Sequence, residues 1–206
     1  SGKFDADQIF NWTYEDEQQA RADWNDGTQE NPYAALPTLN LLTYQLSRMI
    51  TDRLAEGVAI EEDEASLDFT FDLNQFFATK DNGFFEYETE VIKFLDCLTT
   101  NDKYPFSTPA LRDEIRHSFW LLSRVASAKA LEKLLRAHPV FKDYTVVLAA
   151  GDGRTDEDDP VTIGKSLDKV RSAIAEAEAT GGKTITLSVG QLTTGVTVPE
   201  WTAVIM

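Results

Sequence analysis

The second half of the chain alternates short apolar runs with amphipathic stretches, and this alternation most constrains the fold. Residues 126–137 and 165–180 carry apolar side chains at helical spacing, and each stretch lies between two apolar runs. The runs have the length of strands and cover residues 117–122, 144–150, 184–189 and 202–206. We therefore expect an α/β fold in which helices flank a parallel sheet.

The first half is predicted to be mostly helical, and we place the boundary between residues 111 and 112. Region 1–111 is interpreted as a mixed entry segment and insertion, and region 112–206 as the α/β domain. Thr108-Pro109 is typical of a helix start, since proline is favoured at the first helical position. Other predicted elements are a surface helix at 14–24, a strand at 38–43, a helix at 46–54, an acidic loop at 56–68 and a helix around 91–98.

Charge and composition exclude several classes of protein. Lys and Arg total 19 against 35 Asp and Glu, and a net charge of −16 argues against autonomous nucleic-acid binding. No apolar run approaches the ~20 residues that span a bilayer, and no leader is present, so we expect no membrane association and a cytoplasmic location. The single cysteine, Cys97, allows no internal disulfide and is expected to be a packing residue. The apolar run at the end predicts that the chain is part of something longer.

Several local patterns resemble reactive sites only superficially. In VLAAGDGRTD (147–156) a strand opens into Gly-x-Gly, but the third glycine of a dinucleotide fingerprint is absent and the nearby acids would repel a pyrophosphate. Those acids also lack the spacing of a calcium loop, so a solvated loop is expected. The sequence around Ser188 has a threonine, Thr186, where a nucleophile elbow has its first glycine. His117 and His138 do not have the spacing of metal ligands. We expect no catalytic residue and no metal ligand here, and the chain has no Gly-x-x-x-x-Gly-Lys-Ser/Thr phosphate loop.

The last segment is the most specific. GQLTTGVTVPEWTAVIM (190–206) resembles motif V of superfamily-two helicases of the DEAD/DEAH type, where a turn with hydroxyls, a glycine, apolar residues and a proline precede a strand. HSFWLLSR (117–124) is placed like the motif IV strand of these motors, and the next helix and strand follow in the same order. With HPVFKDYTVVLAAGDG (138–153), these segments are similar to helicase regions of large restriction–modification proteins. The resemblance covers roughly residues 112 to 206 and implies a second RecA-like domain.

The resemblance implies roles for four residues of the turn. Thr193 and Thr194 would bind nucleic acid, because their hydroxyls can reach phosphate oxygens. Gly195 and Thr197 occupy nucleotide-binding positions, although Thr197 stands where the family has an aspartate. The turn should then lie at the carboxyl end of the third strand, on the same sheet edge as the loop after the first strand. Thr193, Thr194 and Gly195 should be exposed there.

The leading hypothesis is therefore a fragment of an ATP-dependent DNA helicase or translocase of a restriction–modification or related defence system. DNA and the first RecA-like domain are the expected partners, and ATP and Mg²⁺ the expected cofactors of the whole motor. The fragment by itself is predicted to be inactive. One alternative is a non-catalytic acidic module for protein interaction or regulation. Another is that TTGVTVP merely connects two strands of some other α/β protein.

Overall fold

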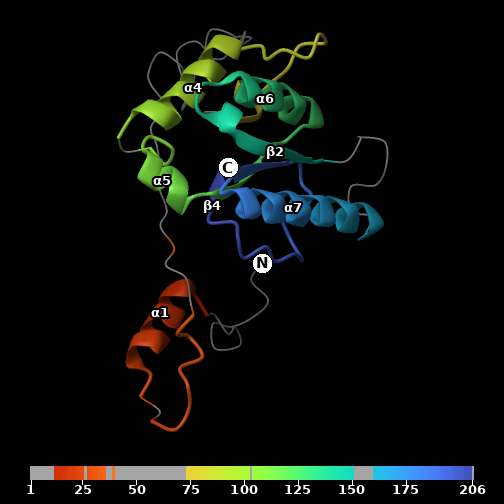
Figure 1. The fold of residues 1–206 in the computed structure, drawn as a ribbon. Coiled ribbons are helices and arrows are strands. Elements are labelled where there is room, and N and C mark those ends of the chain that lie inside the picture. Colours follow the sequence, from red (N-terminus) through yellow and green to blue (C-terminus); the bar gives the residue numbers. More distant parts are fainter. Residues whose placement is uncertain are drawn as a thin grey trace, which may run out of the picture. The chain divides into compact units, whose positions relative to one another are not determined.

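Four parallel strands form the central sheet of the larger part of the molecule (Figure 1). They are β1 (His117–Leu121), β2 (Tyr144–Ala149), β3 (Lys183–Ser188) and β4 (Ala203–Ile205), in the spatial order β2-β3-β1-β4. The computed structural model describes residues 12–25, 27–35, 39, 73–102, 104–150 and 160–205. The chain divides into two compact units, Ser1–Gln45 and Leu46–Met206, and the sheet belongs to the second unit. The predicted parallel α/β fold is confirmed.

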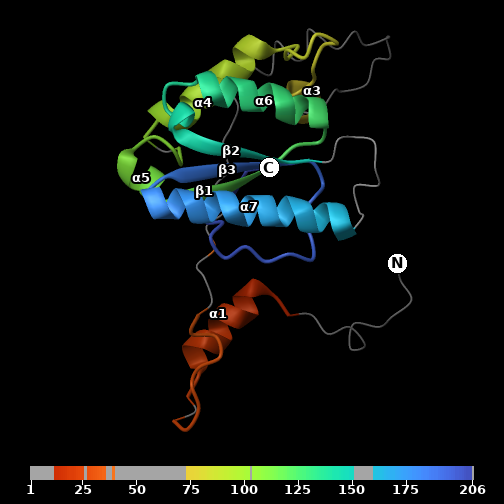
Figure 2. The ribbon, with the colours of Figure 1, turned by 45° about the vertical axis from the view of Figure 1, so that its right-hand side comes forward.

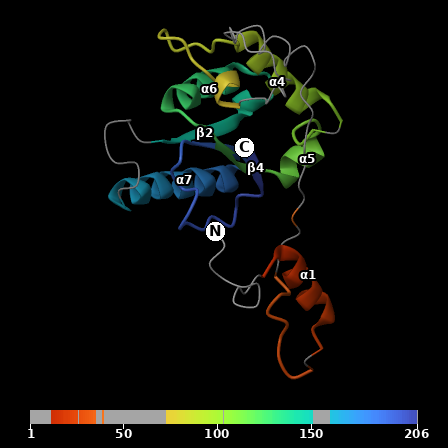
Figure 3. The same ribbon diagram turned by 180° about the vertical axis from the view of Figure 1, so that it is seen from behind.

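Helices cover both faces of this sheet. α6 (Val125–Ala137) lies on one face and α7 (Pro160–Thr180) on the other, as the opposite views in Figures 1 and 3 agree. The right-handedness of connections between parallel strands explains why the two helices lie on opposite faces. The crossover from β1 to β2 and the return from β2 to β3 run in opposite directions across the sheet, so right-handed connections place their helices on opposite faces. Both predicted helices are confirmed, and α7 begins earlier than expected, at Pro160.

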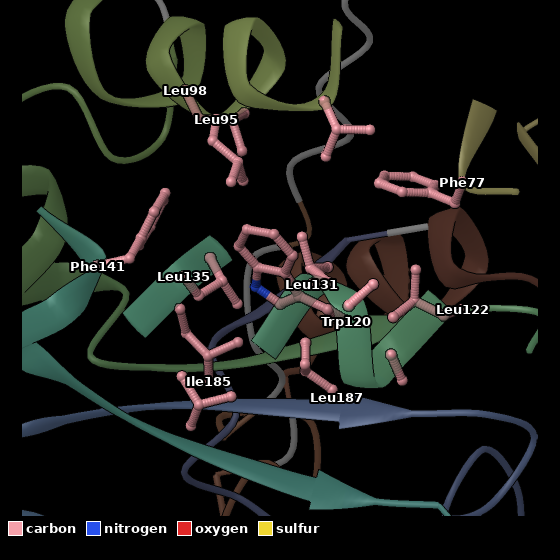
Figure 4. Packing of buried hydrophobic residues seen from close by; sticks show 14 of the residues in the cluster. Phe77, Leu95, Leu98, Trp120, Leu122, Leu131, Leu135, Phe141, Ile185 and Leu187 are labelled. Carbon is pink, nitrogen blue, oxygen red and sulfur yellow. The ribbon is translucent and has the colours of Figure 1, made fainter. Parts of the chain in front are cut away.

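The face beneath α6 holds the larger hydrophobic core, here called the α6-side core. α4 (Glu88–Thr100) lies on this side of the sheet next to α6 (Figure 2). Aromatic rings fill much of the space, and the Phe106 and Phe141 rings meet edge to face with centroids 5.1 Å apart. Figure 4 shows part of this packing. The fully buried residues of the α6-side core include Phe76, Phe85, Val91, Leu95, Phe106, Leu131, Leu135, Phe141, Ile185 and Leu187.

The face beneath α7 holds a smaller α7-side core, built from Phe119, Val147, Ala149, Val170, Ile174, Leu192 and Val198. The last two come from the connection between β3 and β4, which contains no helix. This connection must return to the amino end of β4 on the same face as α7, because it crosses the sheet in the same direction as the step from β2 to β3. Leu192 and Val198 anchor it there.

Side chains of the central strand β3 alternate between the two faces. Ile185 and Leu187 belong to the α6-side core. Thr184, Thr186 and Ser188 therefore lie on the α7 face, and all three are fully buried. A central strand thus presents a row of hydroxyl groups to α7 where an apolar row is the usual pattern for a parallel strand.

Shorter elements precede the sheet or connect its parts. They are α3 (Leu73–Phe76), α5 (Pro109–Glu114) and, between α6 and β2, the 3-10 helix η2 (Phe141–Asp143). The predicted start of α5 is confirmed, since the Thr108 hydroxyl accepts a hydrogen bond from the Leu111 N–H at 3.2 Å. The α6-side core combines residues from both sides of the boundary expected at 111 and 112.

The smaller unit contains α1 (Tyr14–Asp23), a surface helix at the predicted place. Its first turn is held by a capping box, in which the Thr13 hydroxyl accepts from the Asp16 N–H and the Asp16 carboxylate accepts from the Thr13 N–H. No residue of this helix is buried. The Trp24 and Tyr33 rings meet edge to face after it, with centroids 6.3 Å apart.

One expectation about side-chain placement is wrong. Cys97 is exposed, because the buried stripe of α4 runs through Val91, Leu95 and Leu98, and position 97 lies about 100° from the nearest of these around the helix. The predicted strand at 38–43, helix at 46–54, loop at 56–68 and acidic loop at 151–160 lie outside the described residues, except for Leu39 and Pro160.

Candidate functional site

The carboxyl ends of β1 and β3 meet at one edge of the sheet. Leu121 pairs with Ser188 in register, and the Leu122 N–H donates to the Ser188 carbonyl at 2.9 Å. Beyond this point the two chain segments separate, one toward α6 and the other across the α7 face. In open α/β sheets, ligands bind outside the carboxyl ends of the strands where neighbouring connections diverge in this way. We therefore take the loop at 122–124 and the turn at 189–195 as the candidate site.

Three residues of the turn have left-handed backbone conformations. Gly190 has φ 76°, Leu192 has φ 62° and Gly195 has φ 72°. Glycine adopts such angles freely, whereas a leucine loses about 1–2 kcal/mol. Burial offsets this loss, since the Leu192 side chain is 5% exposed in the α7-side core and burying a leucine contributes roughly 1.5–3 kcal/mol. Strained residues of this kind concentrate at functional sites.

Gln191 connects the turn to strand β3 and helix α7. The Ser188 hydroxyl donates to the Gln191 main-chain carbonyl, and the Ser166 hydroxyl on α7 donates to Gln191 Oε1 at 2.8 Å. Gln191 is 2% exposed, and its Nε2 has no hydrogen-bond partner among the described residues. The Thr193 hydroxyl donates to the Gly190 carbonyl at 2.7 Å. These hydrogen bonds therefore hold the base of the turn, whereas its tip, residues 193–195, is exposed.

The tip carries three of the four predicted site residues. Thr193, Thr194 and Gly195 are exposed, as expected, and no atom lies within 4 Å of where a Gly195 Cβ would stand. Among the hydrogen bonds of the described residues, none uses the N–H groups of Thr194 or Gly195. The tip thus presents two backbone donors and two hydroxyl oxygens to the solvent. Donors arranged around a left-handed glycine suit the oxygens of a phosphate.

Thr197 lies apart from this group. It is exposed, and its carbonyl accepts a hydrogen bond from Arg171 Nη2 on α7 at 3.4 Å. Its neighbours Val196 and Val198 pack in the α7-side core, on the stretch that returns toward β4. The structure therefore brings Thr193, Thr194 and Gly195 together and separates Thr197 from them.

Arg124 and Gln191 are candidate site residues that the sequence analysis did not single out. Arg124 is exposed and immediately precedes α6, in the loop that follows the carboxyl end of β1. Its position two residues after a predicted strand was the available signal. Gln191 carried no such signal, because its importance depends on a partner 25 residues away in the sequence.

Helix α7 adds positive charge near the same edge. Its first half carries Lys165, Asp168 and Lys169, and its second half carries Arg171, Glu176 and Glu178. The Lys169 ammonium donates to the Leu148 carbonyl near the end of β2, at 3.2 Å. Lys165 and Lys169 therefore contribute cations near the carboxyl edge, with Asp168 between them.

The two histidines lie elsewhere and have structural partners. His117 Nδ1 is 3.0 Å from the Thr184 hydroxyl at the opposite edge of the sheet, and burial lowers the pKa of His117 more than the nearby Glu178 raises it. His138 follows α6, with its Nε2 3.2 Å from an Asp96 carboxylate oxygen on α4. The described residues contain no group of three or more His, Cys, Asp or Glu side chains placed to hold a metal. Ser188 is fully buried and is not an accessible nucleophile.

Comparison with known proteins gives one informative match. No family model matches the chain, and no solved structure matches it. The chain is 26% identical over 215 aligned residues to a Mycoplasma pneumoniae protein that is provisionally named the C-terminus of a type II restriction enzyme and methyltransferase, RM.MpnORF110P. The alignment includes 96% of this chain and 29% of that protein, so the chain spans less than a third of its relative. The chain is therefore related to a protein of restriction–modification type. Within the described residues, no helix has the length and apolar character needed to cross a membrane.

Proposed function

We propose that the chain forms part of the second RecA-like motor domain of an ATP-dependent DNA helicase or translocase in a restriction–modification system. The observation that carries the proposal is the exposed tip at Thr193, Thr194 and Gly195, whose base is hydrogen-bonded to β3 and α7 at the edge where two parallel strands diverge. The motif V resemblance of the same residues and the restriction–modification relative support it independently.

In this proposal the tip binds the sugar-phosphate backbone of DNA. The N–H groups of Thr194 and Gly195 donate to phosphate oxygens, and the Thr194 hydroxyl rotates to add a further donor, whereas the Thr193 hydroxyl already donates to the Gly190 carbonyl. The absence of a side chain at Gly195 lets the strand approach the backbone closely. Arg124 supplies positive charge from the neighbouring loop. Such contacts position a strand without reading its sequence, which is what a translocating motor requires.

The described residues fit only a small part of an ATP site. Neutral hydroxyls and amides at the tip suit phosphate oxygens, and a threonine replaces the carboxylate that the motif V resemblance leads us to expect at position 197. ATP hydrolysis in such motors depends on a phosphate-binding loop and on Mg²⁺ that neutralises the transferring phosphate. The groups that hold them would come from the first RecA-like domain, outside this chain. Gly195 and Thr197 are proposed to face the cleft between the two domains.

The test compares two variants of the full-length protein that contains this chain. Gly195→Val fills the open space at the tip, and we expect it to abolish the stimulation of ATP hydrolysis by single-stranded DNA. Thr197→Ala, at the second proposed nucleotide-binding position, should reduce stimulation less, because a threonine already stands there in place of the expected carboxylate. The proposal also requires a phosphate loop upstream and an arginine motif downstream in the gene. A Gly195→Val protein that keeps full stimulation would contradict it.

The same experiment separates the alternative function. The charge of −16 favours a non-catalytic acidic module for protein interaction or regulation. Such a module predicts no DNA-stimulated ATP hydrolysis by the full-length protein, and no phosphate loop or arginine motif in the flanks.

A further inference from the structure

Gln191 is an unusual residue to find fully buried beneath the turn. A glutamine amide has two N–H donors and a carbonyl acceptor, and burial without partners is unfavourable. Gln191 satisfies its Oε1 through Ser166, but its Nε2 has no partner among the described residues. A methionine or leucine would fill the same space without an unsatisfied group. The polar side chain therefore serves something other than packing stability.

The hydrogen bonds of Gln191 join three elements at one residue. Its side chain binds Ser166 on α7, and its main-chain carbonyl accepts from Ser188 at the end of β3. The next residue, Leu192, has the strained φ of 62°, and Thr193 begins the exposed tip. Only Leu192 separates the buried contact with α7 from the tip. A shift of α7 relative to β3 therefore acts on a side chain that lies one residue from the backbone of the tip.

We propose that Gln191 is a positioning residue that couples helix α7 to the Thr193–Gly195 tip. Its contact with Ser166 holds the tip in the conformation that binds phosphate, and displacement of α7 releases it. This inference rests on the proposed function, because it assigns the regulation of the same DNA contact. α7 is suited to the role, since its amino-terminal half lies at the same sheet edge and carries the cations described above.

The test uses the 206-residue chain and a set of single substitutions. Gln191→Met keeps the side-chain volume and removes the amide, and Ser166→Ala removes its partner on α7. Ser166→Thr retains the hydroxyl and serves as the conservative rescue. Ser172→Ala, on the exposed face of α7, is the matched control. The double variant of Gln191→Met and Ser166→Ala tests whether the two groups act together.

Backbone ¹⁵N relaxation of the tip gives the decisive readout. In the wild type we expect order parameters typical of rigid backbone, about 0.85, at residues 193–195. Gln191→Met and Ser166→Ala should each lower them toward the flexible range, below about 0.6, and the double variant should add nothing further. The melting temperature of Gln191→Met should stay within a few degrees of the wild type, because the loss of an unsatisfied amide offsets the loss of one hydrogen bond. Ser166→Thr and Ser172→Ala should match the wild type.

Affinity for an oligothymidylate at low salt separates this inference from the proposed function. The variants that loosen the tip should bind it about fivefold more weakly, because a mobile tip must be ordered on binding. If the wild type binds no oligonucleotide, the proposed function fails, while the relaxation data still decide whether Gln191 positions the tip. Unchanged order parameters in both single variants, or additive losses in the double variant, would overturn the inference.

Discussion

Gly195 and Gly164 are two glycines with opposite expected effects on stability. Gly195 has φ 72° and Gly164 lies within helix α7, and at both positions the space that a Cβ would occupy has no other atom within 4 Å. Gly195→Ala should therefore destabilise the fold by about 1–2 kcal/mol through backbone strain alone. Gly164→Ala should stabilise it by roughly 0.5–1 kcal/mol, because alanine loses less entropy in a helix. Urea unfolding of the two variants checks the pair, and equal effects would show that the conformation of the turn differs from the one described.

Because of His117, the folded chain should become less stable as the pH falls. Burial lowers its pKa in the folded state, so the unfolded chain binds a proton more readily than the folded chain does. Its contribution is therefore complete above the unfolded pKa of about 6.5 and is lost as the pH falls below that value. Urea unfolding between pH 7.5 and pH 5, for the wild type and His117→Gln, tests this expectation. The variant should lose less stability on acidification, and an identical decline in both proteins would assign the dependence to other groups.

Helix α1 depends on its cap more than on packing. It buries no residue, and within the described residues it is held by the capping box of Thr13 and Asp16 and by hydrogen bonds from Asn31 to the Arg21 carbonyl and from the Leu39 N–H to the Tyr14 hydroxyl. We expect Thr13→Ala to lower the helicity of residues 14–23, since the loss of such a cap typically removes about 1 kcal/mol from a helix. The sheet unit should unfold at the same temperature as before, because it has its own core. NMR chemical shifts report both regions, and a parallel loss of both would show that the units are coupled.

The elements with strong apolar periodicity were predictable from the sequence. The strands β1 to β4 and helices α4, α6 and α7 occur where the pattern places them, because burial on a sheet or helix face imposes that pattern. The exposure of Thr193, Thr194 and Gly195 was also expected. The structure of the base of the turn could not be predicted. It depends on a hydrogen bond between residues 166 and 191 and on a leucine with a left-handed backbone conformation, which local preferences disfavour. Cys97 was misplaced because it lies between two residues of the buried stripe in the sequence, Leu95 and Leu98, but its position on the helix faces solvent.

At the scale of the whole molecule, a net charge of −16 sets the strength of any DNA contact. Acidic groups repel the phosphate backbone at long range, so the cations near the carboxyl edge must act locally. We expect the 206-residue chain to bind single-stranded DNA weakly and to lose that binding steeply with added salt. It should show no ATP hydrolysis above background, because it contains no phosphate loop. Tight binding at high salt, or measurable turnover by this chain, would contradict the proposed place of the chain in a larger motor.

A single measurement tests the central claim, that the exposed tip is the DNA-binding surface. The ¹⁵N-labelled chain is titrated with an oligothymidylate at low ionic strength, and amide chemical shifts are followed residue by residue. We predict that the largest changes occur at Thr193, Thr194, Gly195 and Arg124, and that they diminish as salt is added. Residues at the opposite edge of the sheet, such as His117 and Lys183, should remain unchanged. Changes confined to that opposite edge, or no changes at millimolar oligonucleotide, would contradict the account.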